Sequence, residues 1–490
     1  MTRSLPFIAG FGVFAACSPA PEAPTSNLVG DTPTVAQAAD GSYISWREHV
    51  IDDLAVGGVA IAGSDGLTGG DLDLDGYLDV VSVHESDTTY DGVADGHIRL
   101  AFGSDDPDKW TLATLAEGPE AGAAEDADIA DVNGDGYPDI IAACELAHLI
   151  YFQNPGKEAR TAKWERLILP LSLYRGSYIR VFFADFNGDG KPEAIAPNKG
   201  GQNPDRATQQ LDKISWLEVT GDPLKGDSWK EHVITEVLIP INSRPVDLDK
   251  DGDLDVLGGS RGERRIFWLD NLGGDKIEFK EYPIKVSGST VPNAQRSRFK
   301  DGKQLLTGFN FEFGDLNGDD RLDIITQEGS NLIWLEQPAD KSEVWQVRVI
   351  GSFYPDSMTG FRFADINEDG RLDLMAGSYS QSPRDHDGPE VTKDGRLGRL
   401  AWFEQPADPT QQWTRHDISR RKRGMFDKFI AKDMDGDGDV DFIGTRGNSV
   451  PWDGVYWLEQ VRTPAPVSSF ERARGEDSME MPLPSEPPTS

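Results

Sequence analysis

A nine-residue segment with oxygen-bearing side chains at its first, third, fifth and ninth positions recurs seven times in the chain. One copy is DFNGDGKPE, which begins at Asp185 and has glycine as its sixth residue. Glycine tolerates positive φ, so the backbone is free to turn sharply and bring the four oxygens toward one point. Oxygen-only ligands on a flexible loop suit a hard cation, and Ca²⁺ accepts irregular ligand sets more readily than Mg²⁺ does. The segment therefore predicts a calcium-binding loop.

All seven copies supply four predicted calcium ligands. In chain order these are Asp71, Asp73, Asp75 and Asp79; Asp131, Asn133, Asp135 and Asp139; Asp185, Asn187, Asp189 and Glu193; Asp247, Asp249, Asp251 and Asp255; Asp315, Asn317, Asp319 and Asp323; Asp365, Asn367, Asp369 and Asp373; and Asp433, Asp435, Asp437 and Asp441. Asp320 replaces the glycine of the fifth copy and Glu193 the last aspartate of the third, so we expect these two loops to bind weakly or differently. Up to seven structural Ca²⁺ ions are predicted.

The loops are separated by 50 to 68 residues, which indicates a repeat architecture. Short apolar segments precede and follow each loop, as in IRVFFA before the third and DLMAG after the sixth. An aromatic segment such as ISWLEV comes next, and a fourth segment such as WKEHVI ends the unit. Runs rich in β-branched and aromatic residues between turn residues are typical of strands. Four short antiparallel strands in each repeat predict the blade of a β-propeller.

The two ends of the repeat region predict how the ring closes. No fourth strand follows the last aromatic segment, VYWLEQ, whereas a segment of the fourth-strand type, ISWREHVI, surrounds Trp46 before the first loop. We expect this N-terminal strand to complete the last blade and to leave no open sheet edge. The predicted fold is an all-β, seven-bladed β-propeller over residues 43–460, with four antiparallel strands per blade.

The loops and their flanking strands resemble FG-GAP or VCBS repeats, the calcium-binding blades of integrin α subunits and of many secreted bacterial proteins. The resemblance covers nearly all of the chain except its ends, and it implies a calcium-stabilised propeller. Its implication for function is broad, because such propellers serve adhesion, glycan binding and, in some polysaccharide lyases, catalysis.

The N-terminal segment predicts export. Residues 1–17 have a basic start, an apolar core too short to span a bilayer and small residues before Cys17, as in a secretory signal. FAAC resembles the bacterial lipobox, which makes Cys17 the expected lipidation site, although Phe14 replaces the usual leucine and ordinary signal cleavage remains an alternative. We expect an outer-membrane lipoprotein or a periplasmic or secreted protein, in contact with the membrane only through the lipid. Residues 18–42 are predicted to be a flexible tether and residues 461–490 a disordered tail.

The net charge of −36 argues against a nucleic-acid partner. The connections on the face opposite the loops are nevertheless basic and aromatic. Guanidinium groups match carboxylate and sulfate, and aromatic rings stack on sugars, so this face predicts an anionic polysaccharide ligand. The alternative is that these arginines pair with neighbouring acids. The candidate ligand residues are Tyr174, Arg175, Arg180, Arg244, Arg298, Arg421 and Arg423.

A polysaccharide lyase is the second hypothesis. Such an enzyme needs a carboxylate-neutralising group, a base and an acid, for which the candidates are His84, Tyr90 and His386. Histidines in solvated loops without a defining motif are more often not catalytic, and no serine-nucleophile elbow, phosphate loop or zinc set occurs. We therefore expect a monomeric binding module rather than an enzyme. A platform for a protein partner is the third hypothesis.

Overall fold

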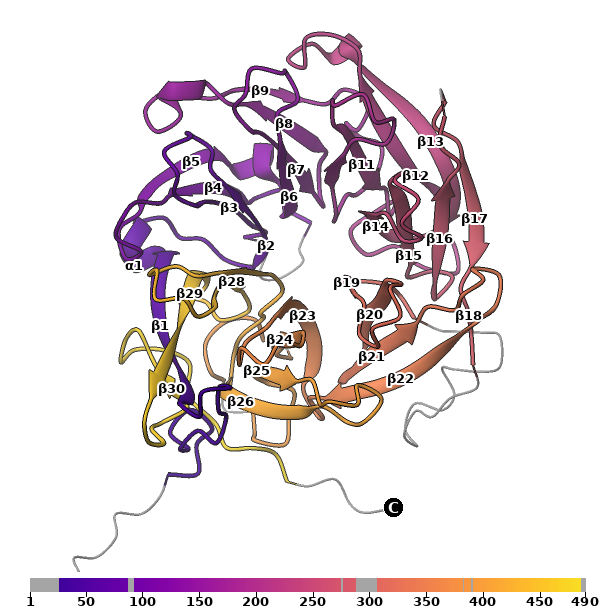
Figure 1. Ribbon diagram of the computed structural model, residues 1–490. Coiled ribbons are helices and arrows are strands. Elements are labelled where there is room, and N and C mark those ends of the chain that lie inside the picture. The colour runs from indigo at the N-terminus through magenta and orange to yellow at the C-terminus, as the bar shows by residue number, and fades with distance from the viewer. Residues whose placement is uncertain are drawn as a thin grey trace, which may run out of the picture.

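Seven β-sheets are arranged around a common centre in the computed structural model (Figure 1). The structure describes residues 26–86, 92–274, 276–287, 306–381, 383–388 and 391–485. Each sheet contains four antiparallel strands, which follow the chain in sequential meander order in six of the seven described sheets, and the inner strand of each faces the centre of the ring. The molecule is a seven-bladed β-propeller, as the repeat pattern predicted.

The blades follow one another along the chain, with four short helical segments in the connections. Written from the inner to the outer strand, the first four blades are β2 (Ser64–Gly70), β3 (Asp79–His84), β4 (His97–Phe102) and β5 (Thr111–Glu117); β6 (Ala124–Ala130), β7 (Asp139–Cys144), β8 (Leu149–Gln153) and β9 (Glu165–Ile168); β10 (Phe182–Ala184), β11 (Glu193–Pro197), β12 (Leu211–Val219) and β13 (Trp229–Leu238); and β14 (Pro240–Val246), β15 (Asp255–Ser260), β16 (Arg265–Asn271) and β17 (Phe279–Pro283). The last three are β19 (Glu312–Gly314), β20 (Asp323–Glu328), β21 (Asn331–Glu336) and β22 (Val344–Ser352); β23 (Ser357–Ala364), β24 (Asp373–Tyr379), β25 (Gly398–Glu404) and β26 (Thr414–Arg421); and β27 (Phe429–Lys432), β28 (Asp441–Arg446), β29 (Gly454–Thr463) and β1 (Tyr43–Asp53). The helical segments are α1 (Leu54–Gly57), η1 (Gly118–Ala121), η2 (Gly156–Glu158) and η3 (Gly226–Ser228).

The last blade combines strands from both ends of the chain. Its outer strand, β1, pairs antiparallel with β29, and Trp46 lies opposite Gln460. Figure 1 shows indigo β1 beside yellow β29. Two short strands extend the outer edges of two blades in parallel: β18 (Lys285–Val286) pairs with β22, and β30 (Phe470–Glu471) pairs with β1.

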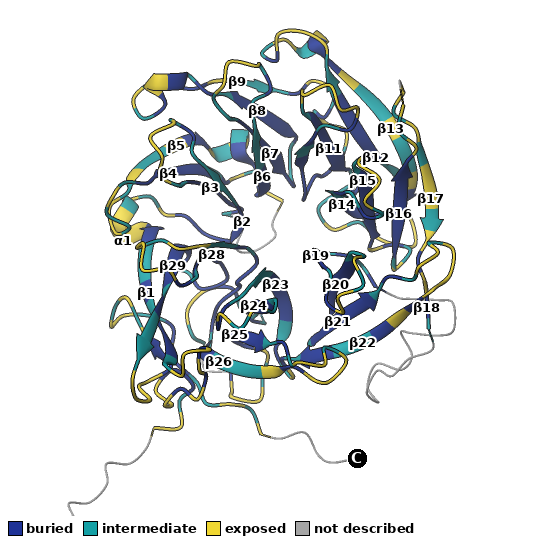
Figure 2. Cartoon of the chain, in the orientation of Figure 1, coloured by how far each residue is buried: buried dark blue, intermediate teal, exposed yellow. Residues whose placement is uncertain are grey.

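Apolar side chains from facing blades form the core, and the strands are accordingly mostly buried while the connections are exposed (Figure 2). Three outer strands also place a histidine over a tryptophan of the neighbouring strand at centroid distances of 4.0 to 4.3 Å. In each case the imidazole Nε2 lies within 3.0 Å of a glutamate oxygen. The pairs are His49 with Trp457, His232 with Trp216, and His416 with Trp402.

The described parts of both terminal segments pack against the propeller, which corrects two expectations from the sequence. Residues 26–42 were predicted to be tether, but Val29 is 5% exposed and Ala36 is 2% exposed. Residues 461–485 were predicted to be disordered, yet they form β30 and bury Glu480, which accepts a hydrogen bond from the backbone of Arg420 (2.7 Å). Buried arginines of the last two blades are the partners of acidic residues in this segment, and the composition of the segment alone does not show this pairing. Cys17 and the predicted signal segment lie outside the described residues.

Within the described ranges, no helix has the length and apolarity to cross a bilayer.

Candidate functional site

The seven predicted calcium loops each join the inner strand of a blade to the next strand, so they lie on one face of the ring. The sharp turn uses positive φ at the fourth and sixth loop residues, for example 60° at Leu74 and 94° at Gly76. Asp320, the residue that replaces glycine, adopts φ 68°. Its N–H still donates to Asp315 (2.8 Å), as the glycine N–H does elsewhere, and its exposed carboxylate pairs with Lys250 (2.8 Å). The substitution therefore leaves the turn intact.

The first aspartate of each loop organises the backbone. In all seven loops it accepts a hydrogen bond from the N–H of the sixth residue at 2.8 to 3.2 Å. In the second loop, Asp131 also accepts from the N–H of Gly134 (2.8 Å) and of Asp135 (3.0 Å). These bonds fix the loop around one carboxylate, so the other oxygen ligands are pre-positioned.

The ninth side chain of each loop is at most 4% exposed and lies at the start of the second strand. Its carboxylate accepts the N–H of the second loop residue at 2.8 to 3.2 Å. Glu193 makes this bond with Phe186 (2.9 Å), so the longer side chain keeps the contact. Burial raises the pKa of the ninth carboxyl to about 6 in Asp139, about 7 in Asp79 and about 8 in Asp373. A bound cation would favour the charged form of these groups.

Three loops bring three carboxylates together, with one oxygen from each within 4.8 Å of the others. These are the loops with aspartate at the third position: Asp71, Asp73 and Asp79; Asp247, Asp249 and Asp251; and Asp433, Asp435 and Asp441. The Oδ1 atoms of Asp73 and Asp249 are buried and have no hydrogen-bond partner among the described residues. A buried carboxylate oxygen without a partner is costly, and a cation would satisfy it. The donor set therefore fits Ca²⁺, and it fits best in these three loops.

The other four loops carry asparagine at the third position. In the second loop, the Asn133 amide nitrogen donates to Asp135 (2.9 Å), which ties two predicted ligands to each other. Because asparagine brings an oxygen without a charge, these loops have a weaker negative field for a cation.

Basic side chains from neighbouring segments also reach some loop carboxylates. Arg160 pairs with Asp73 and Asp75 of the first loop, and Lys341 pairs with Asp249 (2.8 Å) of the fourth. Part of the loop charge is therefore balanced by the chain itself.

Three of the predicted ligand-binding arginines are completely buried and engaged within the protein, so they do not form the expected surface. Arg180 donates to Asp427 (3.2 Å), Arg421 donates to Glu48 (2.8 Å), and Arg423 donates to the carbonyl of His386 (2.8 Å). The alternative of pairing with internal acids holds for Arg180 and Arg421. Their partners are distant in the sequence, which explains why local composition did not reveal them.

The remaining candidates lie in different places. Tyr174 is 94% exposed, and the neighbouring Arg175 pairs with Glu231 (3.3 Å). Arg298 lies outside the described residues. Arg244 has no ion-pair partner among the described residues, and its guanidinium lies 5.0 Å from the ring centroid of Phe182. It lines a cavity of about 270 Å³ formed by inner strands of the ring.

Six of the residues that line this central cavity come from one equivalent position in the repeats. The third residue before the first loop aspartate lines it in six of the seven blades: Thr68, Asp128, Arg244, Glu312, Arg362 and Ile430. Arg362 pairs with Glu312 (3.2 Å), whereas both Asp128 oxygens accept backbone N–H groups at 2.8 and 3.0 Å. Phe311, Phe361 and Phe429 add apolar walls. Comparing this position across the repeats is the sequence signal that would have identified the cavity.

Of the residues proposed for a lyase, His84 and His386 lie within the described part of the chain. His84 is completely buried, and Ser64 (2.7 Å) and Ser82 (3.0 Å) contact its two ring nitrogens. Burial holds the pKa of His84 well below its usual value. His386 is exposed, with Trp452 at 6.5 Å between ring centroids, and Tyr90 lies outside the described residues. A histidine enclosed in this way is a structural residue.

Sequence reasoning missed a second group of acids near the ring centre. Asp65, Glu85 and Glu125 each offer an oxygen within 4.8 Å of the other two. Asp65 and Glu125 both stand six residues before a loop, where a register shift leaves them without a cross-strand partner in β2 and β6. Such bulges redirect side chains, and their recurrence at equivalent repeat positions was the available signal.

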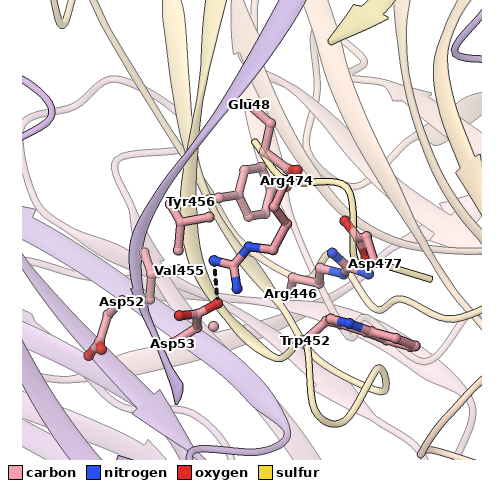
Figure 3. Close-up of a pocket in the computed structure, with 11 residues that line it drawn as sticks. Glu48, Asp52, Asp53, Arg446, Trp452, Val455, Tyr456, Arg474 and Asp477 are labelled. Atoms are coloured by element: carbon pink, nitrogen blue, oxygen red, sulfur yellow. Dashed lines mark hydrogen bonds and ion pairs between the residues drawn. The ribbon is translucent and has the colours of Figure 1, made fainter. Parts of the chain in front are cut away.

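A further small pocket, of about 20 Å³, lies between β1, β29 and the C-terminal segment (Figure 3). Its charged groups are paired: Arg474 contacts Asp53 (2.5 Å), and Arg446 contacts Asp477. Its size and internal pairing leave no room for a ligand of the expected kind.

The FG-GAP-like repeat family matches residues 71–142, 131–196 and 315–376. No curated protein matches the chain in sequence. Among solved structures, the chain is similar to a lectin from Agrocybe aegerita that is described as recognising non-reducing terminal N-acetylglucosamine. That alignment has 12% identity and a TM-score of 0.44, and it covers 86% of this chain and 95% of the lectin chain.

An FG-GAP propeller suggests a binding module. Three matched repeat segments and seven blades of four antiparallel strands fit an FG-GAP repeat β-propeller.

Proposed function

We propose that the protein is a calcium-stabilised binding module that holds an acidic group of a polysaccharide in the central cavity, beside Arg244. The observation that carries this proposal is that Arg244 lines the cavity without an ion-pair partner in the described part of the chain. Other basic groups of the cavity are engaged, since Arg362 pairs with Glu312 and Lys428 lies 3.5 Å from Asp126. An unpaired guanidinium presents a planar fork of donors that matches carboxylate or sulfate.

The cavity also suits the rest of a sugar residue. Its volume of about 270 Å³ is near the lower end for small-molecule sites. Phe311, Phe361 and Phe429 contribute apolar surface, while Thr68 contributes a hydroxyl group. Aromatic and polar walls together favour a glycan end or side group over an extended protein surface.

Calcium and export complete the proposal. Ca²⁺ in the seven loops would hold the blades in position around the cavity, and millimolar calcium outside the cell suits loops of this type. Attachment of lipid at Cys17 would place the ring on the outer membrane, and cleavage without lipidation would release it to the periplasm or medium.

Retention on immobilised polysaccharides tests the proposal. Purified calcium-loaded protein is applied to gels that carry uronate or sulfated polysaccharides, and Arg244→Gln is compared with wild type. We expect Arg244→Gln to lose retention at least tenfold, because a charge-assisted pair in a partly enclosed site is lost. Arg175→Gln is the matched control, since Arg175 is exposed and already paired with Glu231. Equal retention of Arg244→Gln and wild type would overturn the cavity assignment.

The same samples separate the alternatives. New ultraviolet absorbance from unsaturated sugar ends would identify a lyase. Absence of retention and of absorbance with every polysaccharide would reject the glycan ligand and favour a protein partner.

A further inference from the structure

The acidic cluster of Asp65, Glu85 and Glu125 joins the first two blades at the inner side of the ring. Asp65 belongs to β2 and Glu125 to β6, and Glu85 follows β3. A Cβ atom on Gly66 would lie 2.5 Å from the carbonyl oxygen of Glu125, so glycine permits the close approach of these two inner strands. The close approach and the paired bulges together bring the three carboxylates within 4.8 Å.

The neighbouring cations balance only part of this charge. Glu85 pairs with Arg384 (2.6 Å), and the nearby Glu145 pairs with Lys199. Asp65 and Glu125 have no ion-pair partner among the described residues. Asp65 is 5% exposed, and its Oδ2 is buried without a hydrogen-bond partner. Buried carboxylates require hydrogen bonds, a counter-charge, a metal or a retained proton, so the unpartnered oxygen of Asp65 is available to ligate a cation.

The chemistry of the cluster selects the kind of cation. Two uncompensated carboxylates match a charge of +2, and an all-oxygen set matches a hard ion. Ca²⁺–oxygen distances of about 2.3 to 2.6 Å place opposite ligands up to about 5 Å apart, whereas Mg²⁺ limits them to about 4.2 Å. The three oxygens all lie within 4.8 Å of one another, which is compatible with the coordination sphere of Ca²⁺. The adjacent His84 is not a ligand, because Ser64 and Ser82 contact both of its ring nitrogens.

We propose that Asp65, Glu85 and Glu125 bind a Ca²⁺-sized divalent cation at the inner rim of the ring, separate from the seven loops. The ion bridges the first and second blades. This site does not depend on the polysaccharide or on Arg244.

Counting bound ions tests the site against the loops. Full-length mature protein is equilibrated with calcium, and bound ions are counted by native mass spectrometry for wild type and for Asp65→Asn. We expect Asp65→Asn to bind one fewer Ca²⁺ per chain. The matched control is Asp453→Asn, because the Asp453 carboxylate is also buried but accepts hydrogen bonds from Gly63 (2.7 Å) and Ser449 (2.7 Å). The control should keep the wild-type count.

Thermal unfolding gives a second readout, because the substitution should have opposite effects on stability in the calcium-free and in the calcium-bound protein. Removing one of three crowded carboxylates should raise the unfolding midpoint of the calcium-free protein and reduce the gain that calcium brings. Glu125→Gln should behave in the same way and covers the case in which Asp65→Asn fails to fold. If either folded variant keeps the wild-type ion count, the metal site is overturned. If that variant is also more stable than wild type without calcium, the carboxylates share a proton in place of the metal.

Discussion

Whether a charged residue of this propeller stabilises the fold depends on how far its side chain is buried. Asp356 is completely buried and accepts two hydrogen bonds from Arg420 (2.8 and 2.9 Å), while Arg399 contacts it at 2.8 Å. Arg420 adjoins Arg421, one of the residues expected at the ligand face. Arg420 thus stabilises the contact between a strand and a connection rather than a ligand.

Asp356→Asn should therefore lower the free energy of unfolding without a specific effect on polysaccharide binding. The substitution leaves two buried guanidinium groups short of negative charge, and breaking a buried pair typically costs about 3 to 5 kcal/mol. The free energy of unfolding from urea titration at constant calcium measures this loss. Asp222→Asn, which breaks only the exposed pair with Lys225 (3.2 Å), should leave the midpoint almost unchanged. Equal effects of the two substitutions would contradict the assignment.

Among the elements, the strands were predictable and the terminal segments were not. Each blade repeats a local pattern of loop, apolar strand and aromatic strand, so the number of blades and the positions of the loops could be predicted from the sequence. Pairing between distant residues carries no local signal: Glu48 and Arg421 are 373 residues apart. The same limit hid the buried state of Arg180, because its partner Asp427 is 247 residues away in the sequence.

Removal of the C-terminal segment should weaken the last two blades. A chain ending at Thr463 loses β30 and the buried acids Asp477 and Glu480, which leaves Arg421 and Arg446 with fewer partners. We expect a loss of about 3 to 5 kcal/mol or more, by the same argument about uncompensated buried charge. Limited proteolysis and thermal unfolding measure it, with a chain ending at Ser485 as the control. Wild-type resistance of the shorter chain would show that the segment is dispensable.

At the scale of the whole molecule, the ring carries the seven predicted calcium loops on one face and its cavity at the centre, and residues only a few positions before those loops line the cavity. Cation binding in the loops would therefore be coupled to cavity shape through the inner strands. Six inner strands each contribute the residue three positions before their loop to the cavity. A change in the turn of one loop would shift the end of its inner strand and with it that residue.

Calcium removal should then lower both stability and ligand retention. Extracellular calcium sites of this kind contribute on the order of 1 to 3 kcal/mol each when calcium exceeds the dissociation constant tens to a hundredfold. A chelator should lower the unfolding midpoint, calcium should restore it, and magnesium at the same concentration should restore much less, because Mg²⁺ demands a tighter octahedral shell. Asp249→Asn should reduce the calcium gain more than Asn367→Ala, since three carboxylates meet around Asp249, whereas Asn367 brings no charge. If the midpoint were the same with chelator and with calcium, the loops would be turns stabilised by their own hydrogen bonds, and the cavity would owe its shape to strand packing alone.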